Sequence, residues 1–95
     1  MKEASTAAAA QARYKREAAE YAVQYVESGM TVGLGTGTTA IYATRCIAER
    51  YISGQLRDIV AFATSRAVWH AAVKMGIPML TEDMPQGIDL TIDDR

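Results

Sequence analysis

The chain has 95 residues, a formal net charge of −1, and 49% hydrophobic residues. This length suits one domain or part of one, and the composition is typical of a globular protein. The balanced charge gives no basic surface for nucleic acid, and no apolar run reaches the ~20 residues that cross a bilayer. We therefore expect neither nucleic acid nor a membrane as a partner.

The amino-terminal third of the chain predicts a helix that ends at Gly29, since glycine readily adopts the left-handed conformation that follows a helix. Four residues recur with helical spacing and predict its buried face: Ala18, Ala22, Tyr25 and Val26. Residues 1–14 are rich in alanine. The sequence leaves open whether they extend the helix or form a frayed tail.

Strands and helices then alternate along the rest of the chain. Short apolar runs predict four strands, over residues 31–35, 58–63, 77–80 and 88–92. Within a sheet, proline occurs in edge strands or as the first residue of a strand. Pro78 therefore predicts that the third strand lies at an edge of the sheet or begins at this residue. Two more helices are predicted, one over residues 39–52 that stops at Gly54, and one from Ser65 as N-cap to Gly76.

The order is α-β-α-β-α-β-β, within a single domain over residues 1–95. Strands that alternate with helices pair in parallel through right-handed crossovers. The predicted fold class is therefore α/β, a Rossmann-like parallel sheet with flanking helices, here incomplete.

Residues 35–39 read GTGTT and follow the first predicted strand directly. Ligands of open parallel sheets bind beyond the carboxyl ends of the strands. Glycines let a backbone approach a ligand closely, while amide N–H groups at a helix start attract anions. We therefore predict an anion site made of Gly35, Thr36, Gly37, Thr38 and Thr39. The alternative is a tight turn in which Thr38 or Thr39 caps the next helix, which would need one hydroxyl but no pair of glycines.

The residues around this segment favour a small phosphate monoester as the anion. GTGTTA fits the dinucleotide-binding pattern G-x-G-x-x-[GA], but the second strand ends in FATS, without the acid that would hold a ribose hydroxyl. A Walker loop would need a lysine after the glycines, and none follows. A fragment of a dinucleotide-binding oxidoreductase remains an alternative.

Two other strand exits carry polar residues. Thr64 and Ser65 follow the second strand, where either could bind a ligand or cap the next helix. Asp93 and Asp94 follow the last strand, where a carboxylate could do acid–base work or bind sugar hydroxyls. We expect Asp94 and Arg95 to be solvated.

Few other residues have the chemistry of a site. Cys46 is the single cysteine, which excludes an internal disulfide and suits a reducing, cytoplasmic compartment. Its apolar helix face indicates packing rather than a nucleophile. His70 is the single histidine, expected on the surface or in an interface, and no cluster suits a metal ion.

Three stretches in this order, VGLGTGTTA, DIVAFATS and MGIPMLTEDMPQGIDLTID, resemble the amino-terminal part of type A ribose-5-phosphate isomerases. The resemblance runs from about residue 15 to residue 93. It implies interconversion of ribose 5-phosphate and ribulose 5-phosphate through an enediol, with neither a metal nor an organic cofactor. It also implies that residues 35–39, Thr64 and Ser65 surround the substrate, and that Asp93, the first aspartate of a DGADE motif, contacts the sugar as a catalytic residue.

The chain departs from this family after Asp93, where Asp94 and Arg95 stand in place of Gly-Ala-Asp-Glu. The family's later lysine and its proton-shuttling glutamate have no counterpart in these 95 residues. We therefore expect a fragment that binds the phosphate, has little activity alone, and self-associates as a homo-oligomer through an open sheet edge. The alternatives are a sugar-phosphate sensor without catalysis and a structural element of an oligomer.

Overall fold

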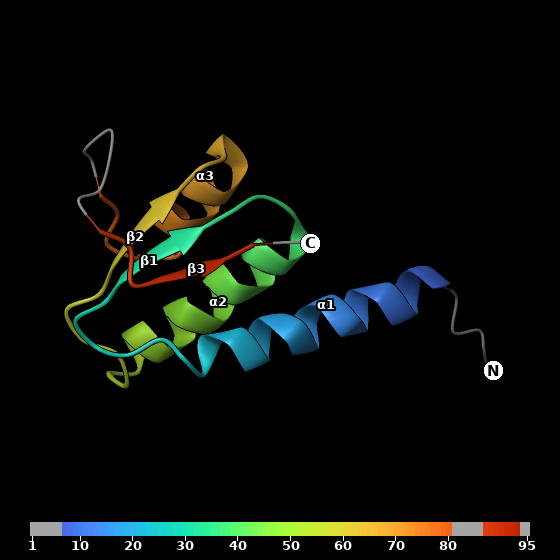
Figure 1. Cartoon of the computed structure of the whole chain (residues 1–95), viewed down its shortest axis with the longest axis horizontal. Helices are drawn as coiled ribbons and strands as arrows, with labels where there is room; N and C mark the ends of the chain where they lie inside the picture. The colour runs from blue at the N-terminus through green and yellow to red at the C-terminus, as the bar shows by residue number, and fades with distance from the viewer. Residues whose placement is uncertain (1–6, 81–86, 94–95) are drawn as a thin grey trace.

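A computed structural model describes residues 7–80 and 87–93 of the chain (Figure 1). These residues form α1 (Ala7–Val23), β1 (Thr31–Leu34), α2 (Thr38–Ile52), β2 (Val60–Ala63), α3 (Arg66–Lys74) and β3 (Leu90–Ile92). The strands make one parallel sheet in the order β2-β1-β3. The predicted α/β class, with a parallel sheet and flanking helices, is confirmed.

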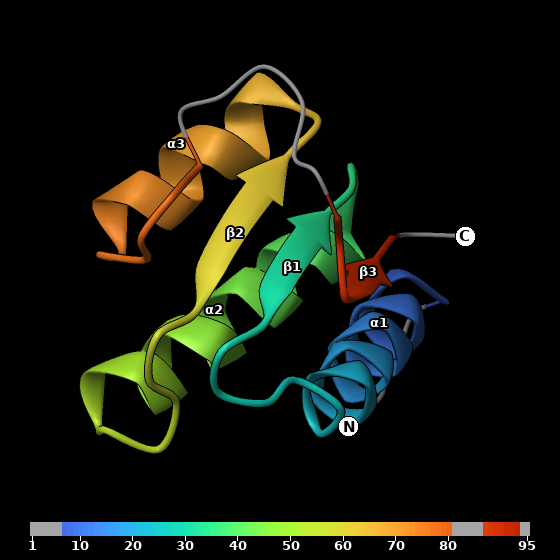
Figure 2. The ribbon, with the colours of Figure 1, turned by 60° about the vertical axis from the view of Figure 1, so that its left-hand side comes forward.

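The central strand β1 fixes where the other two strands end. Leu34 pairs with Ala63 of β2 and with Ile92 of β3, so the last residues of all three strands lie in one row. Figure 2 shows α2 behind β1 and β2, with α1 and α3 to either side of it. The core lies between these helices and the sheet, and each helix contributes a fully buried side chain to it: Val23, Ile47 and Val68.

The first helix ends earlier than the glycine pattern predicts. α1 stops at Val23, and Gly29, with φ 88°, lies in the loop before β1, where its amide donates a hydrogen bond to the carbonyl of Arg57 at 3.0 Å. The glycine serves a turn rather than a helix end. At the other end, residues 7–14 belong to the helix, so over this range the structure shows the helix extension, one of the two alternatives that the sequence left open.

The buried face of α1 is displaced by one residue from the predicted one. Ala18 and Tyr25 are exposed, and Ala19 and Val23 are buried instead, whereas Val26, which follows α1, is buried as predicted. At the surface, the hydroxyl of Tyr25 shares a hydrogen bond of 3.0 Å with that of Tyr21. A tyrosine counts as apolar in a helical pattern, although its polar end favours exposure.

The predicted strand over residues 77–80 is reduced to one isolated bridge between Ala61 and Met79. The amide of Ala61 donates to the carbonyl of Pro78 at 2.9 Å, and the amide of Leu80 donates to the carbonyl of Ala61 at 2.8 Å. Proline has no amide hydrogen, so the ladder cannot continue through it. The segment does lie at an edge, beside β2, as Pro78 predicts. The described order is therefore α-β-α-β-α-β.

The predicted helix cap and two of the predicted helix ends are confirmed, while other predictions fall on residues that the structure does not describe. Ser65 caps α3, and Gly54 and Gly76 follow α2 and α3 with positive φ angles of 88° and 91°. Residues 81–86, Asp94 and Arg95 lie outside the described residues. Within the described ranges, no helix is long and apolar enough to cross a membrane.

The position of Ile47 in the core leads to a stability prediction. We expect Ile47→Ala to lower the free energy of unfolding by about 2–5 kcal/mol, because it leaves a cavity at a fully buried site. Ile52→Ala, on the same helix but 73% exposed, is the matched control and should cost less than about 0.5 kcal/mol. Urea unfolding followed by circular dichroism measures both. Equal losses would contradict this description of the core.

Candidate substrate-binding site

The parallel sheet brings three strand exits together. Gly35 follows β1, Thr64 follows β2, and Asp93 follows β3. The amide of Gly35 donates to the carbonyl of Ile92 at 2.8 Å, and the amide of Thr64 donates to the carbonyl of Leu34 at 3.1 Å. These two hydrogen bonds extend the ladder by one step on each side of β1. Three predicted site segments, 58 residues apart at the extremes, thus lie side by side.

The helix after β1 begins without a side-chain cap. Its N-cap is Gly37, with φ 97°, a residue that makes no side-chain capping hydrogen bond. The alternative in which Thr38 or Thr39 caps this helix is therefore wrong. A positive φ strains any residue with a Cβ, which gives Gly37 a backbone reason to be glycine. With no capping oxygen from Gly37, the helix start stays available to an external anion.

The threonines of this loop differ in exposure. Thr36 and Thr38 are exposed, as is Gly37 between them, whereas Thr39 is 8% exposed. The two exposed hydroxyls flank the open helix start. Thr39 is therefore the least accessible of the three hydroxyls, and its role in the site stays a prediction.

At the exit of β2 the two hydroxyl residues have different roles. The side chain of Ser65 accepts a hydrogen bond of 3.1 Å from the amide of Val68 and so caps α3. Thr64 is exposed and does not form that cap. Of the two roles that the sequence left open for Ser65, the structure shows the cap, and ligand contact by its hydroxyl stays a prediction.

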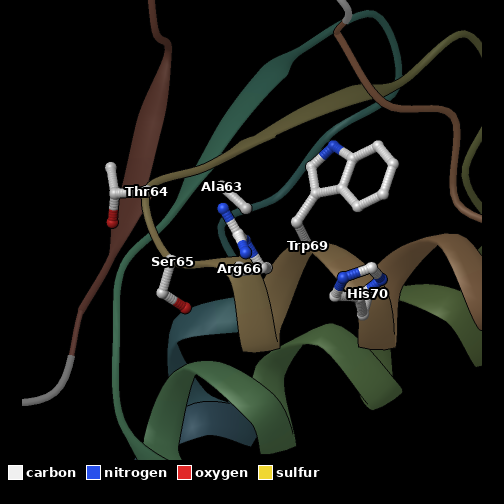
Figure 3. Close-up of a pocket in the computed structure, with 6 residues that line it drawn as sticks. All are labelled: Ala63, Thr64, Ser65, Arg66, Trp69 and His70. Atoms are coloured by element: carbon white, nitrogen blue, oxygen red, sulfur yellow. The ribbon is translucent and has the colours of Figure 1, made fainter.

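A cavity of about 460 Å³ opens beside this exit, lined by Ala63, Thr64, Ser65, Arg66, Trp69 and His70 (Figure 3). Trp69 and His70 contact each other edge to face, with ring centroids 5.4 Å apart. The sequence analysis missed Arg66 and Trp69. The sequence did offer a signal for them: they follow the predicted cap Ser65 by one and four residues. This spacing places both in the first turn of α3, next to the exit of β2. Residues 35–39 and Asp93 lie at the neighbouring exits and are not among the lining residues.

The environment of Cys46 disfavours a nucleophilic role. Burial raises the pKa of the half-buried Cys46 thiol, and the carboxylates of Glu20 and Glu49 raise it further. A raised pKa lowers the thiolate fraction at neutral pH, which disfavours a nucleophilic role. Across residues 7–80 and 87–93, no group of three or more His, Cys, Asp or Glu side chains could hold a metal ion.

Comparison with known proteins finds relatives that share one name, ribose-5-phosphate isomerase. The chain is 45% identical over 80 residues to ribose-5-phosphate isomerase A of Roseiflexus castenholzii, and 45% identical over 83 residues to the probable ribose-5-phosphate isomerase 1 of Arabidopsis thaliana. These alignments cover 84% and 87% of this chain, but only 34% and 31% of the relatives. No family model matches the chain.

Solved structures agree with these relatives. The ribose 5-phosphate isomerase of Plasmodium falciparum superposes with a TM-score of 0.81 at 42% identity, over 86% of this chain and 35% of that one. A D-ribose-5-phosphate isomerase in complex with phospho-erythronic acid superposes with a TM-score of 0.80 at 33% identity, over 85% of this chain and 35% of that one.

The fold and the sequence thus resemble those of sugar-phosphate isomerases. More closely, the resemblance to type A ribose-5-phosphate isomerases that the sequence indicates is confirmed over more than four fifths of the chain. The chain spans about a third of the length of the relatives it matches.

The contrast between the two helix starts leads to a second prediction. We expect Ser65→Ala to lower the free energy of unfolding by about 1 kcal/mol, because α3 loses its N-cap. Thr38→Ala removes an exposed hydroxyl from a helix that has no side-chain cap, so its effect should stay within about 0.5 kcal/mol. Thermal and urea unfolding measure both changes. A larger loss for Thr38→Ala would contradict the assignment of the caps.

Proposed function

We propose that this chain forms the phosphate-binding part of a ribose-5-phosphate isomerase, which interconverts ribose 5-phosphate and ribulose 5-phosphate. The observation that carries the proposal is the open start of α2, next to two strand exits that bear a hydroxyl and a carboxylate. A relative solved in complex with phospho-erythronic acid supports it, because that ligand also carries a phosphate.

In this proposal residues 36–39, in the loop after β1 and at the start of α2, hold the phosphate. The amides of the first turn of α2 carry the positive end of the helix dipole, and a phosphate dianion neutralises it. The hydroxyls of Thr36 and Thr38 are exposed beside this turn and donate further hydrogen bonds. Binding energy from the phosphate, remote from the reacting carbons, then lowers the barrier by fixing their position.

The sugar would extend from the phosphate over the neighbouring strand exits. Asp93, at the exit of β3, would accept hydrogen bonds from sugar hydroxyls or exchange a proton with the substrate. Thr64, exposed at the exit of β2, would form the opposite wall. Ser65 would act there mainly through its cap on α3, which fixes the turn that carries Thr64.

The relatives are about three times as long as this chain. We propose the isomerisation itself only for a protein of that full length. The proton-shuttling glutamate that the resemblance implies has no counterpart among these 95 residues. Removing a positioned base typically lowers the rate by about 10²–10⁴-fold. We therefore assign binding, rather than turnover, to this chain alone.

Three broader assignments belong to the same proposal. The reaction is a step of the pentose phosphate pathway, and the single cysteine suits a cytoplasmic location. Within the described residues β3 pairs on one side only, with β1. An unpaired strand edge favours pairing with another chain, which supports a homo-oligomer.

Ligand binding tests the proposal directly. We expect Thr38→Ala to weaken ribose 5-phosphate binding by about 1.5–3 kcal/mol, roughly 10- to 150-fold, because one hydrogen bond to a charged group is lost. Ser53→Ala is the matched control: it removes an exposed hydroxyl at the other end of α2 and should leave the affinity unchanged. Isothermal titration calorimetry measures both.

The same titration separates the competing functions. Absence of binding to the unmodified chain at millimolar ribose 5-phosphate would contradict the proposal. Turnover by the 95 residues at the rate of an intact relative would contradict the assignment of binding alone. A chain that binds NAD in preference to ribose 5-phosphate would instead support the dinucleotide alternative.

A further inference from the structure

Gly35 lies directly against the side chain of Asp93. A Cβ built on Gly35 would overlap the carboxylate of Asp93 and would lie 3.1 Å from its Cβ. β1 and β3 run side by side (Figure 2), and the hydrogen bond of 2.8 Å from the amide of Gly35 to the carbonyl of Ile92 holds the two backbones together at this point. Neither backbone segment can move away to make room for a side chain without breaking that hydrogen bond.

Backbone conformation does not explain this glycine. The described glycines with positive φ are Gly29, Gly37, Gly54 and Gly76, and Gly35 is not one of them. An L-residue could therefore adopt the φ angle of Gly35 without strain. What a side chain could not do at this position is share the space that Asp93 occupies.

Gly33, two residues earlier on the same face of β1, provides a milder case. A Cβ there would lie 3.1 Å from the Oγ1 of Thr91 and 3.2 Å from the Cγ2 of Ile88. These contacts are tight, but they involve side-chain atoms that need to move by only a few tenths of an ångström. The two glycines thus leave one face of β1 bare where side chains of the β3 segment lie across it, most closely at Asp93.

We propose that Gly35 is a positioning residue for Asp93: it has no side chain, and the carboxylate lies in the space thus left over the exit of β1, beside the phosphate loop. This inference rests on the proposed function, in which Asp93 contacts the sugar. It also changes the role expected for Gly35, since Asp93 and not the phosphate takes the space above it. A side chain at position 35 displaces the carboxylate from the sugar and leaves the open helix start at Gly37 intact.

A double-mutant cycle with two ligands tests the inference. Isothermal titration with ribose 5-phosphate and with inorganic phosphate would be applied to the unmodified chain, Gly35→Ala, Asp93→Gly and the double variant. We expect Gly35→Ala to weaken ribose 5-phosphate binding about tenfold or more, and to change phosphate binding less than about twofold. In the Asp93→Gly background, Gly35→Ala should cause no further loss, because nothing remains to be displaced.

Gly33→Ala is the matched control, with the same added methyl group on the same face of the strand. It should leave the preference for ribose 5-phosphate over phosphate unchanged. An unaltered ribose 5-phosphate affinity in folded Gly35→Ala would overturn the inference, and so would a loss that is additive with that of Asp93→Gly. If Gly35→Ala lowered the affinities for ribose 5-phosphate and for phosphate equally, the inference would also be overturned, because the defect would then lie in the phosphate loop.

Thermal unfolding separates this inference from the proposed function. If the unmodified chain binds neither ligand, the proposed function fails, and the midpoints of unfolding still test the contact. Gly35→Ala should then melt lower than the unmodified chain, or fail to fold, and Asp93→Gly should restore most of the difference. A Gly35→Ala defect that Asp93→Gly does not relieve would show that Asp93 does not occupy the space.

Discussion

Parallel pairing of β1 with both of its neighbours is the constraint on which the site depends. Since Leu34 pairs with Ala63 and with Ile92, the strands end in the same row and the chain leaves all three in the same direction. A shift of one strand by a residue would turn its side chains to the other face and separate its exit from the others. The chemistry of the site is therefore fixed by the register of the sheet before any ligand is present.

The two helices that leave this edge begin in different ways. α3 is closed by Ser65, whereas α2 begins at a glycine that offers no capping oxygen. A helix start without an N-cap side chain is a cost to the isolated fold, because one of the usual partners of its first amides is missing. A phosphate bound there, as we propose, would offset that cost and would link the stability of the loop to occupancy by the ligand.

Much of this arrangement could be predicted from the sequence, for identifiable reasons. The three helices, β1 and β2 follow from apolar periodicity, and Ser65 and Gly76 mark the ends of α3 by local rules of capping. Residues 35–39 could be singled out as a candidate phosphate loop because their glycines and hydroxyls are adjacent in the chain. The α1 face was displaced because tyrosine counts as apolar in the pattern, and residues 77–80 failed as a strand because Pro78 cannot donate. Such errors arise where one residue has two competing properties.

Other features depend on contacts that no local pattern contains. Gly35 and Asp93 are 58 residues apart, and their contact follows only from the pairing of β1 with β3. The cavity beside Thr64 likewise needs side chains from α3 to lie against the exit of β2. Sequence reasoning therefore singled out polar residues at the strand exits, but it did not find the contact between Gly35 and the side chain of Asp93.

The central claim is that the first turn of α2 holds the phosphate of a pentose phosphate. Two-dimensional NMR of the ¹⁵N-labelled chain during titration with ribose 5-phosphate tests it most directly, because each backbone amide reports separately. The account predicts that the amides of Gly37, Thr38 and Thr39 shift most, while those of Gly54 and Gly76, at the opposite ends of their helices, stay unchanged. Saturable shifts centred elsewhere, with the amides of residues 37–39 unmoved, would contradict it.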